Sequence, residues 1–180
     1  MRKNVLVYGL ISGLIVSLVM LIPLSLSYKN ENMMEGSVWI GYASMLIAFS
    51  MIYVGIKNYR DKYNDGVISF GKAFTIGLLI TLIASTIYVL TWQIENHFFF
   101  PEFIDKYSAH ELTKLKSGGL SQQLIDQKTT DMMNMKEMYK KPLMNIIFTY
   151  LEILPVGLVV SLICAAILKR KNKPMQTQMV

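Results

Sequence analysis

The sequence has few charged residues and one cysteine, and each shortage excludes a class of protein. Only 17% of its 180 residues are charged and 53% are hydrophobic, which is more apolar than a soluble domain of this size needs. Cys164 is the single cysteine, so no disulfide can form within the chain, and redox chemistry is not expected. The sequence also contains no nucleotide-binding glycine loop, zinc-ligand spacing or nucleophile motif. We therefore expect a protein that is not an enzyme and binds no cofactor or metal.

The apolar residues form four long blocks, each long enough to cross a hydrocarbon core of about 30 Å. Three blocks contain no charged residue, and the fourth contains only Glu152. The blocks are residues 5–26, 38–56, 73–94 and 143–168. The first block is longer than the core of a secretory signal, and no small-x-small cleavage site follows it, so we expect it to stay attached. The sequence predicts an all-α membrane protein with four transmembrane helices in a single membrane domain over residues 1–180.

Lysine and arginine are densest in three short segments, which predict the orientation in the membrane. These segments are residues 2–3, 57–72 and 169–173. Because cytoplasmic segments are rich in Lys and Arg, we expect both termini to be cytoplasmic. Lys140 and Lys141 lie at the predicted outer end of the fourth block and oppose this trend, so the prediction rests on the density of the short segments. The basic residues behind the net charge of +6 then set the topology and attract the chain to anionic lipids of the bilayer. We expect no nucleic-acid partner.

The connection over residues 95–142 is too long for a loop without secondary structure in a compact protein. Its apolar residues recur at helical spacing on either side of Gly118 and Gly119, where a first helix can end. Ser121 is placed to cap a second helix, and Pro142 marks the return to the membrane. We predict an extracytoplasmic helical hairpin over residues 98–141, between the third and fourth spans. A spacer that merely joins those spans is the alternative.

Small residues recur every fourth position in three of the blocks. These residues are Gly9, Gly13 and Ser17, then Gly77, Thr81 and Ser85, and finally Gly157 and Ser161. Helices in lipid approach one another most closely where side chains are short, so each set predicts a helix-packing face. Gly and Ser are also simply frequent in membrane helices, which is the alternative explanation. The packing could hold one bundle together or join two copies of the chain.

Glu152 is the strongest candidate for a functional residue. An ionisable group inside a span is costly and usually faces a cavity or a partner. Pro155 follows three residues later, removes a helical N–H and predicts a helix kink that would open space nearby. A transporter or proton relay could use such a carboxyl. A structural role is the alternative, in which a protonated Glu152 donates a hydrogen bond to a neighbouring carbonyl or accepts one from Ser17, Ser85 or Tyr88.

The segment between the second and third blocks has the clearest local signals. Asn64, Asp65 and Gly66 predict a tight turn, and Ser69 is placed to cap the helix that follows. Residues 66–74 (GVISFGKAF) and 150–157 (YLEILPVG) resemble the signatures of a bacterial membrane family of Bacteroidetes type, catalogued only as a domain of unknown function. The resemblance extends over nearly the whole chain. It implies four spans and a bacterial inner membrane, and it supplies no activity, ligand or catalytic residue.

Two function classes follow from these observations. The first is a non-enzymatic scaffold or accessory subunit of the bacterial inner (plasma) membrane, whose partner is another membrane protein or a second copy of the chain. The second is a small transporter or channel that uses Glu152. A water-filled path that reaches Glu152 would favour the second class.

Overall fold

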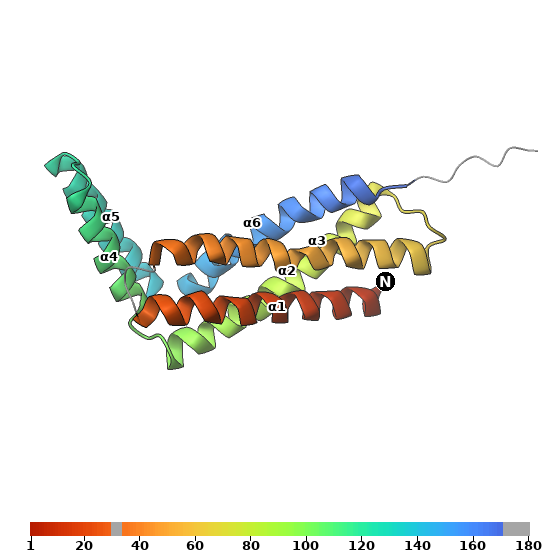
Figure 1. The fold of residues 1–180 in the computed structure, drawn as a ribbon, viewed down its shortest axis with the longest axis horizontal. Coiled ribbons are helices and arrows are strands. Elements are labelled where there is room, and N and C mark those ends of the chain that lie inside the picture. Colours follow the sequence, from red (N-terminus) through yellow and green to blue (C-terminus); the bar gives the residue numbers. More distant parts are fainter. Residues whose placement is uncertain (30–33, 171–180) are drawn as a thin grey trace, which may run out of the picture.

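The protein is all-helical in the part of the chain that the structure, a computed structural model, describes: residues 1–29 and 34–170 (Figure 1). Six helices follow one another in these two ranges, with no strand. They are α1 (Arg2–Lys29), α2 (Met34–Tyr63), α3 (Phe70–Phe98), α4 (Phe103–Ser117), α5 (Gln122–Tyr139) and α6 (Pro142–Leu168). The all-α fold class predicted from the sequence is confirmed.

Four of these helices, α1, α2, α3 and α6, are long and apolar enough to cross a membrane. Each contains one of the four predicted blocks, and the helices extend beyond the blocks at every end except that of α6, which ends with its block at Leu168. The largest extension is in α2, whose apolar block ends at residue 56 and whose helix continues to Tyr63. A charged residue ends an apolar block, but Lys, Arg and Tyr can all continue a helix. Composition therefore shows where the apolar run ends and does not show where the helix ends.

The four long helices form a bundle in which α1 packs against α2 and α3, and α6 packs against α3 and α2. The shorter helices α4 and α5 lie side by side at one end of the bundle, and the N-terminus lies at the other end (Figure 1). An ion pair of 2.7 Å between Lys136 Nζ and Asp105 Oδ1 joins α5 to α4.

The basic segments predicted to be cytoplasmic come together at the end that holds the N-terminus. Ile68, which precedes α3, forms an isolated β-bridge with Arg170, which follows α6. Residues 171–173 of the last basic segment lie outside the described residues. The predicted turn is present, with positive φ angles at Asp65 (50°) and Gly66 (74°). Ser69 caps α3 by accepting a hydrogen bond of 3.3 Å from the Lys72 backbone N–H.

Ser121 was also expected to cap a helix, and the structure corrects this. It occupies the position before α5, but its side chain makes no capping hydrogen bond. Position alone is therefore not sufficient, because the hydroxyl must also turn toward the first free N–H groups.

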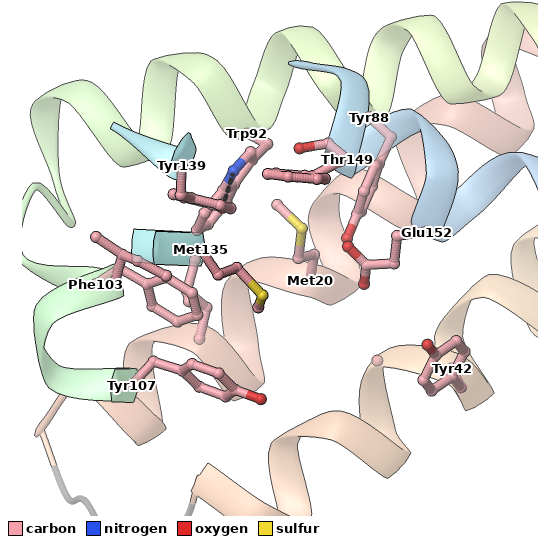
Figure 2. Close-up of a pocket in the computed structure, with 14 residues that line it drawn as sticks. Met20, Tyr42, Tyr88, Trp92, Phe103, Tyr107, Met135, Tyr139, Thr149 and Glu152 are labelled. Atoms are coloured by element: carbon pink, nitrogen blue, oxygen red, sulfur yellow. Dashed lines mark hydrogen bonds between the residues drawn. The ribbon is translucent and has the colours of Figure 1, made fainter. Parts of the chain in front are cut away.

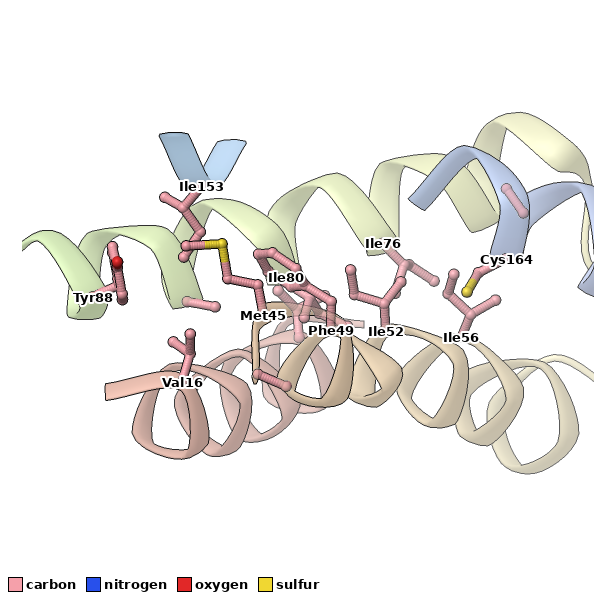
Figure 3. Close-up of a cluster of buried hydrophobic side chains, with 14 of the residues drawn as sticks. Val16, Met45, Phe49, Ile52, Ile56, Ile76, Ile80, Tyr88, Ile153 and Cys164 are labelled. Atoms are coloured by element: carbon pink, nitrogen blue, oxygen red, sulfur yellow. The ribbon is translucent and has the colours of Figure 1, made fainter. Parts of the chain in front are cut away.

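The bundle is tightly packed in the half nearer the chain ends. Phe49, Ile52 and Ile56 of α2 meet Ile76 and Ile80 of α3, and all five are at most 1% exposed (Figure 3). Ile153 and Met45 continue this core toward the other end (Figure 3). The interior here leaves no room for added atoms, as is usual for protein cores.

All eight of the small residues expected at packing faces are buried. A Cβ added at Gly13 of α1 would lie 2.6 Å from Ile87 Cδ1 of α3. One added at Gly77 of α3 would lie 2.9 Å from Ser161 Oγ of α6. The Thr81 and Ser161 hydroxyls are 3.1 Å apart and share a hydrogen bond between the same two helices. Short side chains thus coincide with close helix approach within one copy of the chain.

Candidate functional site

A pocket of about 430 Å³ lies at the end of the bundle covered by α4 and α5, and all six helices contribute to its wall (Figure 2). Its volume falls within the usual range for ligand sites, about 300–1,000 Å³. The lining residues are Met20 and Leu24 of α1, Gly41 and Tyr42 of α2, Tyr88 and Trp92 of α3, Phe103, Ile104 and Tyr107 of α4, Met135 and Tyr139 of α5, and Phe148, Thr149 and Glu152 of α6.

One side of this pocket is a continuous aromatic wall. The Trp92 indole meets the Phe103 ring edge-on, with centroids 5.1 Å apart, and Phe103 stacks on Tyr107 at 6.1 Å. Trp92 Nε1 donates a hydrogen bond of 2.8 Å to the Tyr139 hydroxyl, and Tyr139 stacks on Phe148 at 6.4 Å. These contacts connect α3, α4, α5 and α6, so the aromatic side chains both line the pocket and hold α4 and α5 on the bundle.

Glu152 supplies the only carboxylate among the described residues that line the pocket. Its side chain points into the pocket on the same side as Tyr88, and Tyr42 of α2 lies across from it (Figure 2). Within the described part of the chain, the carboxylate accepts no hydrogen bond and forms no ion pair. The neighbouring Thr149 hydroxyl donates to the Asn145 backbone carbonyl at 2.8 Å, so it is directed away from the carboxylate.

The structure does not bring Glu152 to the serine partners that the sequence suggested. The Ser17 and Ser85 hydroxyls are buried and have no hydrogen-bond partner among the described residues. Pro155 lies inside α6, which remains helical over its full length around it. The kink expected at Pro155 stays a prediction.

Two tyrosines of the aromatic wall lie on α4 and α5, outside the long helices. Burial raises the pKa of the Tyr139 hydroxyl, and the nearby Glu152 adds to the increase. Burial also raises the pKa of Tyr107, with a smaller contribution from Glu111. Both hydroxyls are therefore neutral near pH 7 and act as hydrogen-bonding groups, not as charges.

A second, more polar pocket of about 430 Å³ adjoins the first and shares Ile104 and Tyr139 with it. Gln93, His97 and Lys140 are among its polar lining residues. Gln93 Nε2 donates a hydrogen bond of 2.7 Å to Asn145 Oδ1, which ties α3 to α6 beneath it. No group of three or more His, Cys, Asp or Glu side chains in the described ranges could hold a metal ion.

Sequence reasoning missed Glu95, which was assigned to the connection after the third block. It belongs to α3, is 4% exposed, and neither carboxylate oxygen has a hydrogen-bond partner among the described residues. The sequence spacing could have predicted this burial. Glu95 continues the three- and four-residue steps of one buried face of α3, which carries Thr81, Ser85, Tyr88 and Trp92.

Four long apolar helices with two shorter helices at one end define a multi-pass helical membrane protein. The chain belongs to the family described as "Protein of unknown function (DUF4199)", which matches residues 7–170. No curated protein and no solved structure matches the chain. The resemblance to a family of unknown function is thus confirmed, whereas its bacterial, Bacteroidetes-type origin stays a prediction.

Proposed function

We propose that the protein is a non-enzymatic scaffold or accessory subunit of the bacterial inner membrane, with both termini in the cytoplasm. The main support is the packed core between the pocket and the chain ends. Met45, Phe49 and Ile153 are at most 1% exposed and fill the bundle beyond Glu152. A substrate path through one copy of the chain would have to displace these side chains, which close packing makes costly.

The orientation is supported by the position of the basic residues. Lys57 and Arg60 near the end of α2, and Arg170 after α6, lie at the end of the bundle that also holds the N-terminus. If this end faces the cytoplasm, as the distribution of Lys and Arg favours, α4 and α5 lie on the outer side of the membrane.

The surface offered to a partner is the outer side of α5. Met133 lies on this side, because it is two residues, or about half a turn, from the pocket-lining Met135, and its side chain is 58% exposed. Methionine side chains adapt to varied apolar contacts and are common at binding surfaces. The partner is another membrane protein or a second copy of the chain.

Photo-crosslinking in native membranes tests the scaffold role. A photoreactive residue at Met133 should yield a discrete crosslinked product, because it lies on the proposed contact surface. The same residue at Leu10, an exposed position in the apolar part of α1, should react with lipid only. Equal products at both positions, or none at Met133, would contradict a partner on α5.

The alternative is a small transporter or channel that uses Glu152, and the pocket that reaches this carboxylate favours it. Flux of protons or cations into liposomes separates the two roles. The scaffold proposal predicts that liposomes with the parent protein are no more permeable than protein-free ones. Flux through the parent that Glu152→Gln abolishes, and that Glu102→Gln preserves, would replace the proposal with the transporter. Glu102 is an exposed residue just before α4, so its variant makes the same chemical change outside the pocket.

A further inference from the structure

The pocket combines one carboxylate with a lining of aromatic and aliphatic side chains. No Lys or Arg is among its described lining residues, so nothing in the wall neutralises Glu152 when it is ionised. An unpaired charge in apolar surroundings is unfavourable, and a cation that enters such a site removes this cost. The site is therefore complementary to a ligand that carries one positive charge.

The aromatic rings favour the same kind of ligand. Tyr88 lies beside the carboxylate and Tyr42 lies across the pocket from it (Figure 2). The aromatic wall from Tyr107 to Phe148 lines the same pocket. The faces of aromatic rings carry partial negative charge and attract cations, and quaternary ammonium groups are often held by several such rings. Direct coordination of a divalent metal ion suits this lining poorly, because such an ion is usually held by several carboxylate or carbonyl oxygens and the pocket supplies one carboxylate.

The remaining lining is apolar and adaptable. Met20 and Leu24 of α1 and Met135 of α5 border the space that the rings leave. Such side chains accommodate an alkyl or aryl group of variable shape. We propose that the pocket binds an organic ammonium ion that carries an apolar group, with the ammonium beside Glu152 and the apolar group between Met20 and Met135. This inference goes beyond the accessory role and holds whether or not α5 has a partner.

Tryptophan fluorescence offers a direct test, because the chain has only two tryptophans and one lines the pocket. Trp39 is 79% exposed on α2, so Trp39→Phe leaves Trp92 as the sole reporter. The probe is benzyltrimethylammonium, titrated into the purified full-length chain in maltoside micelles. The comparison ligand is neopentylbenzene, which has the same shape with carbon in place of the charged nitrogen. We expect benzyltrimethylammonium to bind more tightly, by on the order of tenfold or more.

Two variants assign the charge preference to Glu152. Glu152→Gln should weaken binding of the cation by on the order of tenfold and leave the neutral ligand unaffected. Glu102→Gln should change neither. Equal affinity of the parent for the two ligands, or no binding of either, would overturn the proposal without any variant. Unchanged cation binding by a folded Glu152→Gln protein would overturn it as well.

Lipid competition identifies the source of the ammonium group. Phosphatidylethanolamine carries an ammonium headgroup, whereas phosphatidylglycerol carries none. Competition by the first lipid alone supports a membrane lipid as the natural ligand, and competition by neither supports a free organic cation. Equal competition by both would show a site for lipid chains without selection for the ammonium, and would refute the proposal. None of these outcomes depends on crosslinking at Met133, so the two proposals can fail separately.

Discussion

Gly157 of α6 lies at the tightest part of the bundle, and adding one methyl group there tests the packing directly. A Cβ at this position would overlap Thr81 Cγ2 of α3 and lie 2.8 Å from Phe49 Cζ of α2. Neither neighbour can withdraw easily, because Thr81 is 0% and Phe49 is 1% exposed. Forcing an extra methyl group into a well-packed core costs about 1–3 kcal/mol.

Alanine also favours the helix over glycine by about 1 kcal/mol, so the net loss for Gly157→Ala is at most about 2 kcal/mol. Gly41→Ala is the matched control, because Gly41 lies inside α2 and an added Cβ meets no atom within 4 Å. Both variants gain the same helix propensity. The difference between them therefore isolates the clash, and we expect it to be about 1–3 kcal/mol.

Cys164 provides the assay, since it is the only cysteine and is buried on α6, seven residues after Gly157. Its modification by a maleimide, measured over increasing denaturing detergent, reports separation of α6 from the bundle. Gly157→Ala should become reactive at a lower detergent fraction than the parent, and Gly41→Ala at the same or a higher one. Identical curves for the two variants would show that α6 does not pack as described.

Four further outcomes are expected. A topology reporter fused after Arg170 should report the cytoplasm and one at Gly118 the outside; an external Arg170 would reverse the orientation. Tyr139→Phe removes the hydrogen bond from Trp92, and unfolding measurements should show a loss of about 1 kcal/mol. Burial raises the pKa of Tyr139, so rising pH ionises the unfolded chain first; stability should fall above about pH 10, and less steeply in Tyr139→Phe. Replacing residues 103–136 with a short flexible linker should leave an inserted bundle, because longer loops add little closure entropy; failure to insert would make α4 and α5 part of the folding unit.

The four long helices were predictable because a membrane demands long apolar segments, and composition alone reveals these. The turn at Asp65 and Gly66 was predictable for a different reason, since its conformation depends on the residues within it. Most helix ends were not predictable in this way. The apolar block of α2 ends before Lys57 and Arg60, but its helix continues through them. The hydropathy of a segment shows where an apolar run ends, and it does not show where the helix ends.

The pocket was predictable only in part. Glu152 could be identified from the sequence, because a single charged residue in an apolar block is visible without knowing how the helices pack. The aromatic wall depends on how α3, α4, α5 and α6 lie relative to one another, and no local pattern links Trp92 to Tyr139 across 47 residues. Glu95 was missed because an acidic residue at the end of an apolar block was assumed to mark the membrane surface, whereas α3 continues past it and buries it.

One end of the bundle has a packed core and the other end contains the pocket. Toward the chain ends, Gly77 and Gly157 let α3 and α6 approach until their side chains touch. Toward α4 and α5, Tyr88 of α3 and Phe148 of α6 line the pocket, while Gln93 of α3 still donates a hydrogen bond to Asn145 of α6. Helices α4 and α5 cover this pocket, and Glu152 lines it at the level where the packed core begins with Ile153.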